Sequence, residues 1–436
     1  MLKKLAFAVV AVAASIPAIG HAQSLAGTWI GRATYRGDDL PIELTFETTS
    51  SGPQGFLTAP TLRTHRYPLR NVSQSTNEVS FDVVSDAGTF EFVGRVAGST
   101  LKGTWNLFGV GAEVVAIRGT ARTVPYVRES VSCRNGDVTL AGTLLVPSGP
   151  GPHPAVVFAH GSGPETRDAS SFLADQLARR QIVALTFDKR GTGASTGNWR
   201  EADFNDLAGD VLGCIDLLKT RNNIDKSRIG IAGASQAGWV APLAASRSKD
   251  IAFIALVSGP AVPVWKEGWW DTEFRMRERG FGDRDIEKAR AILQLNDDVT
   301  RTGDGFTELS RLIEASRAEP WFPALGFQQA PAPDAPFRTF YRRILDFDPL
   351  PLLQGLSIPS LWLFGGRDGE MPSQESAIVL DRLRAQGQPI TVRTFPDADH
   401  SLFVTNSTPS FRWPRVAPGY IETFVDWVSN VAFNAR

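Results

Sequence analysis

"RIGIAGASQAGWVAPLAA" (residues 228–245) joins an apolar β-type run to an apolar helical run, with Ser235 at the junction. The pattern predicts a strand, a sharp turn and a helix. A nucleophilic serine needs this setting, because it must project from a strained turn at the edge of a sheet, with small residues two positions before and after it. Gly233 meets the first requirement, while Ala237 adds a methyl group at the second. The five-residue pattern alone is weak, and a serine that caps an ordinary helix is the alternative.

The later sequence supplies partners for such a serine in the chain order serine, acid, histidine. Of the five histidines, only His400 follows Ser235, in "FPDADHSLF" (395–403) after a β-type run. Asp368 follows another strand-like run through a glycine turn in "LWLFGGRDGEMP" (361–372), and Glu370 is the nearby second candidate for the acid. The carboxylates directly before His400 are too close in sequence for a relaxed contact. We therefore expect a catalytic set of Ser235, Asp368 and His400.

An oxyanion formed at this serine needs two backbone N–H groups. One is expected from Gln236, and the other from "FAHGSGP" (158–164), where Gly161 and Ser162 are the candidate donors. We expect His160 to shape this loop. "FDKRGTGAS" (187–195) lacks the lysine of a P-loop and the third glycine of a dinucleotide fingerprint, so structural support of the site is its expected role.

Residues 125–436 predict an α/β domain. Apolar runs such as "PAVVFAH" (154–160) and "IAFIALVSG" (251–259) alternate with helical patterns, which is typical of a mostly parallel sheet covered on both faces. Residues 261–346 interrupt this alternation with helical segments and read as a lid over the site. We expect the lid's aromatic residues to serve packing more often than ligand contact. They are Trp265, Trp269, Trp270, Trp321 and Phe322.

Residues 24–122 predict a separate all-β domain. Runs such as "LPIELTF" (40–46) and "VSFDVV" (79–84) alternate apolar and polar residues. "LAGTWIG" and "LKGTWNL" place Trp29 and Trp105 in matching contexts that resemble small lipocalin-like barrels; a β-sandwich is the alternative. Such a domain can bind a ligand or brace its neighbour, and we favour bracing.

Residues 1–22 have the features of a secretory signal peptide. A basic start at Lys3 and Lys4 precedes the apolar run "LAFAVVAVAASI", and small residues end the segment at Ala22, the expected cleavage site. The alternative is an uncleaved amphipathic helix. The mature protein is therefore expected to be periplasmic or secreted. In an oxidising compartment Cys133 and Cys214 can form one disulfide, but two separate buried thiols remain equally open.

The composition excludes several partners. A formal net charge of -1 gives no reason to expect nucleic acid or an anionic membrane surface. The histidines are scattered and form no His-x-x-x-His pair, so we expect no metal site, and no motif calls for a cofactor. No segment after residue 22 is long and apolar enough for a membrane anchor. The oligomeric state is not indicated.

The motifs "HGSGP", "DKRGTGAS", "GASQAG", "GGRDGEMP" and "DADH" occur in the order seen in the α/β-hydrolase superfamily. The set, with "GSGPETRD" (161–168), resembles bacterial carboxylesterases of the serine-aminopeptidase-like and dienelactone-hydrolase-like branches that carry an N-terminal β domain. The resemblance implies an α/β-hydrolase fold and a serine carboxylesterase, with Ser235, Asp368 and His400 as nucleophile, acid and base. Because the expected lid is aromatic and carries no obvious cluster of charge, we expect the substrates to be small to medium acyl esters. Ala237 departs from the family's glycine at the turn.

Two other functions stay open. One is a serine peptidase that holds a substrate amine on lid carboxylates, for which Glu267, Asp271 and Glu273 are candidates. The other is a ligand-binding protein with an inactive hydrolase scaffold. The complete Ser–Asp–His set argues against the second.

Overall fold

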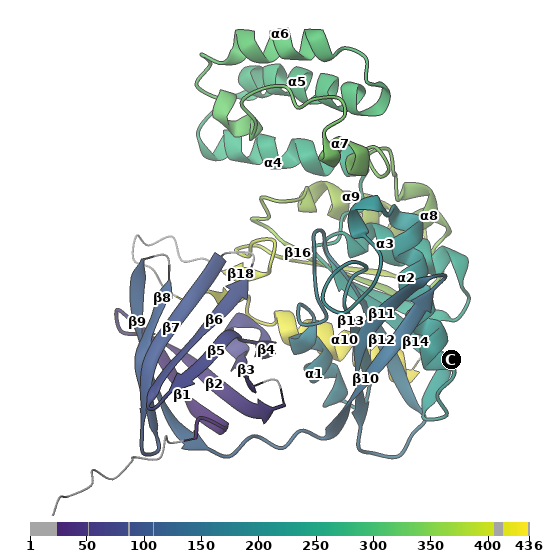
Figure 1. The fold of residues 1–436 in the computed structure, drawn as a ribbon. Helices are drawn as coiled ribbons and strands as arrows, with labels where there is room; N and C mark the ends of the chain where they lie inside the picture. Colours follow the sequence, from purple (N-terminus) through teal and green to yellow (C-terminus); the bar gives the residue numbers. More distant parts are fainter. Residues whose placement is uncertain (1–23, 51, 86–87, 108, 405–412, 435–436) are drawn as a thin grey trace, which may run out of the picture.

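The computed structural model describes residues 24–434 except 51, 86–87, 108 and 405–412. The predicted signal peptide therefore lies outside the described residues. An all-β domain comes first and is followed by a mixed α/β domain, and a group of helices lies above the second domain (Figure 1). None of the helices within the described residues has the length and apolar character needed to cross a membrane.

The first domain is a nearly closed barrel made from a single antiparallel sheet. In the part of the chain that the structure describes, nine strands follow the order β4-β3-β2-β1-β9-β8-β7-β6-β5, so the alternative of a two-sheet sandwich is wrong. The strands are β1 (Gly27–Tyr35), β2 (Asp38–Thr49), β3 (Gly52–Ala59), β4 (Thr64–Pro68), β5 (Arg70–Ser75), β6 (Glu78–Ser85), β7 (Gly88–Ala97), β8 (Thr100–Leu107) and β9 (Val110–Gly119), with a short helix η1 (Pro60–Leu62) before β4.

Side chains fill the interior of this barrel. The alternating residues of β2, from Leu40 to Phe46, are buried, as the period-two pattern predicts. Phe81 and Phe92 stack with ring centroids 4.5 Å apart. Trp29 is fully buried, and its indole N–H donates a 2.8 Å hydrogen bond to the Leu25 carbonyl. The domain is thus built around a packed core.

The second domain is built on an eight-stranded sheet of the order β10-β11-β13-β12-β14-β15-β16-β17. The strands β12 to β17 run parallel to one another, whereas β11 is antiparallel to both of its neighbours, β10 and β13. The strands are β10 (Tyr126–Asn135), β11 (Val138–Pro147), β12 (His153–Ala159), β13 (Val183–Phe187), β14 (Ile224–Ala234), β15 (Ile251–Val257), β16 (Ser360–Gly365) and β17 (Ile390–Phe395).

Helices cover both faces of this sheet, as expected from strands that are apolar on both sides. On one face α2, α3, α8 and α9 share a hydrophobic core with the sheet, and on the other α1 and α10 do so. The helices are α1 (Ser171–Ala178), α2 (Phe204–Lys219), α3 (Ala237–Arg247), α8 (Leu350–Gly355), α9 (Ser373–Ala385) and α10 (Tyr420–Asn434), with a short helix η2 (Trp199–Glu201) before α2.

A helical cap is inserted between β15 and β16 and stacks above α8 and α9 (Figure 1). It has a hydrophobic core of its own, in which Trp321 and Phe322 are buried. Trp269 donates its indole N–H to Asp297 at 2.9 Å. Trp269, Trp321 and Phe322 therefore pack the cap itself, as predicted. Trp270 instead donates its indole N–H to the Asp368 carbonyl at 3.2 Å. The cap helices are α4 (Val264–Glu278), α5 (Asp283–Thr302), α6 (Phe306–Ser316), η3 (Phe322–Leu325) and α7 (Pro336–Tyr341).

Cys133 and Cys214 form a disulfide with their Cα atoms 4.8 Å apart. The bond joins β10, at the edge of the sheet, to α2, which packs on one face. It settles the alternative that the sequence left open in favour of a single bridge.

Candidate active site

Ser235 occupies a strained turn between β14 and α3. Its φ of +52° lies in the left-handed region, which residues with a side chain rarely adopt. The backbone N–H of Ser235 is held by the Val257 carbonyl at 2.9 Å, and α3 begins two residues later. The surroundings therefore impose the strain, as is typical of functional turns.

The structure also shows how the methyl group of Ala237 is accommodated. A Cβ atom placed on Gly233 would lie 2.5 Å from the Ala237 Cβ and 2.7 Å from the Ala159 carbonyl oxygen. The bare Cα of Gly233 thus leaves the space that the fully buried Ala237 methyl occupies. Gly238 lets α3 pass close to the loop after β15, since a Cβ there would lie 2.6 Å from Gly259.

Asp368 and His400 are brought together from the ends of two neighbouring strands, β16 and β17. Asp368 Oδ2 lies 2.9 Å from His400 Nδ1. The other carboxylate oxygen of Asp368 accepts the backbone N–H groups of Glu370 and Met371 at 2.9 and 3.0 Å. These contacts fix a fully buried carboxylate so that it holds the proton on Nδ1 and leaves Nε2 available.

The charge state of His400 reflects opposing influences. Burial, the largest, lowers its pKa, but the hydrogen bond and charge of Asp368, with Glu370 and Glu267, raise the pKa above its ordinary value. Glu370, the second candidate for the acid, lies on the opposite side of the ring from Asp368, with its Oε2 atom 3.8 Å from Nε2. The geometry therefore makes Asp368 the partner of Nδ1 and Glu370 a neighbour of Nε2.

The expected oxyanion donors differ in availability. Within the described residues the backbone N–H of Gln236, at the start of α3, finds no hydrogen-bond acceptor. The N–H of Gly161, by contrast, donates to Glu165 Oε2 at 2.8 Å. This bond corrects the expectation for Gly161, because its N–H already has an acceptor. Ser162, which is exposed in the same loop, remains the candidate second donor.

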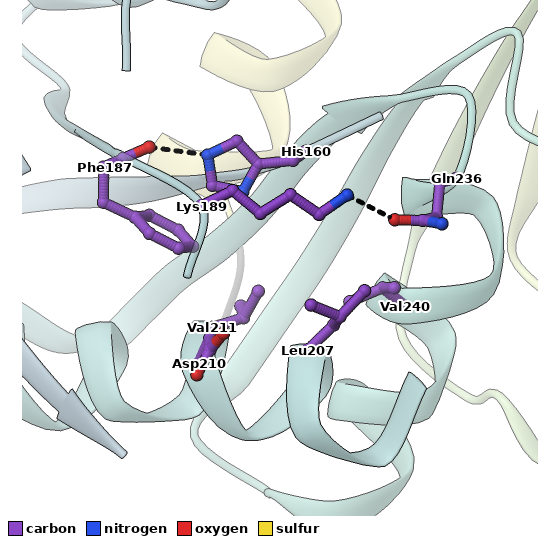
Figure 2. Close-up of a pocket in the computed structure, with 8 residues that line it drawn as sticks. All are labelled: His160, Phe187, Lys189, Leu207, Asp210, Val211, Gln236 and Val240. Atoms are coloured by element: carbon purple, nitrogen blue, oxygen red, sulfur yellow. Dashed lines mark hydrogen bonds between the residues drawn. The ribbon is translucent and has the colours of Figure 1, made fainter. Parts of the chain in front are cut away.

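Lys189 links the two loops that carry these donors, and the sequence did not single it out. Its Nζ donates to the Gly161 carbonyl at 2.8 Å. It also donates to the Gln236 side-chain oxygen at 2.8 Å, as Figure 2 shows. Burial lowers its pKa to about 8, against the opposing influence of Glu165 and Asp210. A lysine two residues after the end of an apolar strand, in "FDKRG", was the available signal.

The remainder of the 187–195 loop is structural. The Asp188 carboxylate accepts two hydrogen bonds from the Arg167 guanidinium, at 2.9 and 2.7 Å. Arg190 pairs with Asp210 through two bonds of 2.7 Å. His160 bonds the Phe187 carbonyl at 2.5 Å, and burial lowers its pKa to about 3, so it stays neutral at physiological pH. These contacts fix the loop from which Lys189 reaches the site.

A small cavity of about 10 Å³ lies beside Lys189 and Gln236 (Figure 2). This volume suits about one water molecule and is too small for an acyl group. The cavity is therefore not the binding site for the acyl group, and it lies among the residues that hold the site's loops in place. Its lining consists of His160, Phe187, Lys189, Leu207, Asp210, Val211, Gln236 and Val240.

The three cap carboxylates that could hold a substrate amine, Glu267, Asp271 and Glu273, differ in their ion pairs within the described residues. Asp271 pairs with Arg275 at 2.7 Å, and Glu273 is held by Arg290 through bonds of 2.6 and 2.7 Å. No ion pair of Glu267 is found among the described residues. Burial raises its pKa to about 7; the charge of His400 opposes this rise, and nearby carboxylates, Asp368 first among them, add to it. Glu267 is thus the lid carboxylate that interacts electrostatically with the Asp368–His400 pair.

Comparisons with known proteins agree with this architecture. Residues 156–410 match the family model described as "Alpha/beta hydrolase family". Esterase EstD from Thermotoga maritima is 25% identical over 293 residues, which cover 65% of this chain and 63% of the relative. The chain therefore spans less than two thirds of that relative's length. An uncharacterized protein from Pseudomonas aeruginosa, PA2218, is 30% identical over 105 residues, 23% of this chain and 28% of the relative.

Solved structures also resemble the chain. The Pyrococcus furiosus esterase Pf2001 superposes with a TM-score of 0.47 and 17% identity over 73% of this chain and 96% of the other. The family match covers more than half of the chain, and the sheet order with helices on both faces confirms the predicted fold class. With its preceding β domain, the chain belongs to the alpha/beta hydrolase family.

Proposed function

We propose that this hydrolase is a serine carboxylesterase that acts on small to medium acyl esters through an acyl-enzyme. The observation that carries the proposal is the 2.9 Å bond between Asp368 and His400, at the same edge of the sheet as the strained turn of Ser235. Parallel strands present their carboxyl ends, and the residues that follow them, at one edge. The esterase named among the relatives supports the same reaction class.

In the proposed mechanism His400 Nε2 takes the proton from Ser235 Oγ as the oxygen attacks the ester carbonyl. Asp368 stabilises the imidazolium that forms. The oxyanion of the tetrahedral intermediate accepts hydrogen bonds from the backbone N–H groups of Gln236 and Ser162. His400 then protonates the leaving alcohol, and a water molecule activated by the same nitrogen hydrolyses the acyl-serine.

An organophosphonate probe tests the nucleophile, because it reacts covalently with an activated serine. We expect the wild-type protein to be labelled at Ser235 and the Ser235→Ala variant to lose both labelling and ester hydrolysis. Ser246→Ala is the matched control, since its hydroxyl lies on α3 and bonds the Leu243 carbonyl away from the site. Labelling of Ser235→Ala at the wild-type rate would refute the assignment.

The proposed substrate class rests on the aromatic composition of the cap, whose sequence carries no obvious cluster of charge. Hydrolysis of p-nitrophenyl esters of increasing acyl length should be fastest for short and medium chains. A preference for very long or charged acyl groups would contradict this part of the proposal.

The position of Glu267 supports a second candidate function, that of a peptidase that recognises the free amine of its substrate. A carboxylate close to the Asp368–His400 pair, with no basic partner among the described residues, is suited to bind an ammonium group. Aminoacyl anilides would then be hydrolysed faster than simple esters, and Glu267→Gln would raise KM for the anilides alone. Asp271→Asn is the control, because Arg275 already neutralises that carboxylate.

We also propose that the protein is exported and that its signal peptide ends at Ala22. The Cys133–Cys214 disulfide supports an oxidising destination. N-terminal sequencing of protein from the periplasm or medium should begin at Gln23. Protein recovered only from the cytoplasm with Met1 intact would contradict export.

A further inference from the structure

His400 lies in a segment that the β domain contacts directly. Three residues after His400, β18 (Phe403–Val404) pairs with β19 (Arg415–Val416) in antiparallel register. The Ala417 N–H extends this pairing by donating to the Leu402 carbonyl at 2.9 Å. Figure 1 shows β18 beside the barrel. The β18–β19 pairing therefore links β19 to the turn that holds His400.

Trp413, two residues before β19, is inserted into the core of the barrel. Its side chain is 4% exposed and belongs to the same hydrophobic cluster as Trp29 and Phe92. Its ring centroid lies 6.3 Å from that of Trp105. An indole buried in a different domain anchors the chain that carries it, because withdrawal would expose a large apolar surface to water.

Asp38, the first residue of β2, holds this segment with polar contacts. Its Oδ2 atom accepts the backbone N–H of Trp413 at 2.9 Å, and its backbone carbonyl accepts the indole N–H at 3.0 Å. Its Oδ1 atom accepts a hydrogen bond from the Arg415 guanidinium. One residue of the barrel thus binds the chain on both sides of residue 414.

Arg63 makes a second contact from the barrel to the same region. Its guanidinium lies 4.6 Å from the ring centroid of Phe403 and donates to the Tyr420 hydroxyl at 3.2 Å. The barrel therefore touches β18 as well as the segment before β19. On its own side, the hydrolase domain holds His400 through the Ser258 hydroxyl, which donates to the His400 carbonyl at 2.6 Å, and through Asp368.

From these contacts we propose that the N-terminal β domain positions His400 for catalysis, with Asp38 and Trp413 as the positioning residues. The proposal rests on the esterase function proposed above. Misplacement of a catalytic group by about 1 Å costs about 100-fold in rate. The imidazole must satisfy Asp368 on one nitrogen and Ser235 on the other, so it tolerates little displacement. The barrel's role is then to brace the base rather than to take up a substrate.

The test compares Asp38→Ala and Trp413→Ala with Asp39→Ala. Asp39 is the neighbour of Asp38, but its carboxylate bonds Thr34 and Arg32 on the exposed surface of the barrel. We expect kcat per active site, counted by phosphonate titration, to fall about 10- to 100-fold in the first two variants. KM should stay within about twofold, since neither residue contacts the substrate. Asp39→Ala should match the wild type.

Two further measurements separate positioning from general destabilisation. Loosening the Asp368–His400 contact should move the acidic limb of the pH–rate profile to lower pH in Asp38→Ala. Asp38→Asn keeps an oxygen for the Trp413 N–H and should recover most of the activity. If the variants lose titratable sites while kcat per site and the pH profile stay unchanged, the β domain acts only on stability and the proposal is wrong. Failure of the esterase assignment would show separately, as wild-type protein that neither hydrolyses esters nor reacts with the probe.

Discussion

His400 determines how the activity should depend on pH. His400 must be neutral to accept the serine proton. Its pKa lies above the ordinary 6.5, because the nearby carboxylates raise the pKa by more than burial lowers it. Activity should therefore be lost as the pH falls through a value higher than 6.5. Glu370→Gln removes one charge next to Nε2, so the acidic limb of kcat/KM should shift to lower pH. An unchanged limb would show that Glu370 does not influence His400. Glu375→Gln, which removes a carboxylate bonded to Lys266, is a control.

Lys189 shows how a residue outside the catalytic set can shape the site. Its ammonium group bonds the carbonyl of the Gly161 loop and the side chain of Gln236. Lys189→Met leaves two buried acceptors unpaired and lets the loops move apart, so kcat/KM should fall about 10- to 100-fold. Lys226→Met, at an exposed position of β14, should match the wild type. Steady-state kinetics with a short-chain ester is the measurement, and an unchanged kcat/KM for Lys189→Met would exclude this role.

At the level of single elements, the sequence predicts best what depends on local pattern. The strands before Ser235 and Asp368 end in continuous apolar runs, and the strand before His400 is a shorter β-type run that mixes apolar and polar residues. These patterns place each of the three residues just past a strand end. Contacts between loops that are distant in the sequence cannot be predicted from local pattern. The Glu165 carboxylate that engages Gly161 depends on a turn whose shape no periodicity encodes. Asp38 and Trp413 meet across 375 positions of the chain, so neither residue's local context identifies the other.

The disulfide between β10 and α2 should increase the free energy of unfolding. The Cys133–Cys214 bond joins residues 81 positions apart in the sequence. The closed loop reduces the conformational entropy of the unfolded chain. Its reduction should lower the free energy of unfolding by about 2–4 kcal/mol. Urea unfolding with and without dithiothreitol measures the difference. A Cys133→Ser, Cys214→Ser double variant should be insensitive to the reductant, and equal stability of the oxidised and reduced wild type would contradict the prediction.

At the scale of the whole molecule, the two domains meet around a histidine, His65, whose side chain is 12% exposed. His65 on β4 lies 3.1 Å from the Tyr126 hydroxyl of β10, and that hydroxyl donates to Asp175 of α1 at 2.6 Å. Burial lowers the pKa of His65 to about 4; Asp175 opposes this, whereas Arg128, Arg179 and Arg66 add to it. His65 is therefore neutral in the folded protein, while its unfolded form is protonated below about 6.5.

This difference makes the joint between the domains sensitive to acid. Between pH 6.5 and about 4 the unfolded chain binds the extra proton, so the contribution of His65 to stability is complete above pH 6.5 and is lost as the pH falls. The loss is at most about 3 kcal/mol. His160, whose pKa is also lowered, acts in the same direction and remains in a His65→Gln variant. The free energy of unfolding of the wild type should therefore fall more steeply from pH 7 to pH 4.5 than that of His65→Gln. Parallel curves from urea unfolding would show that His65 does not make the domain junction acid-sensitive.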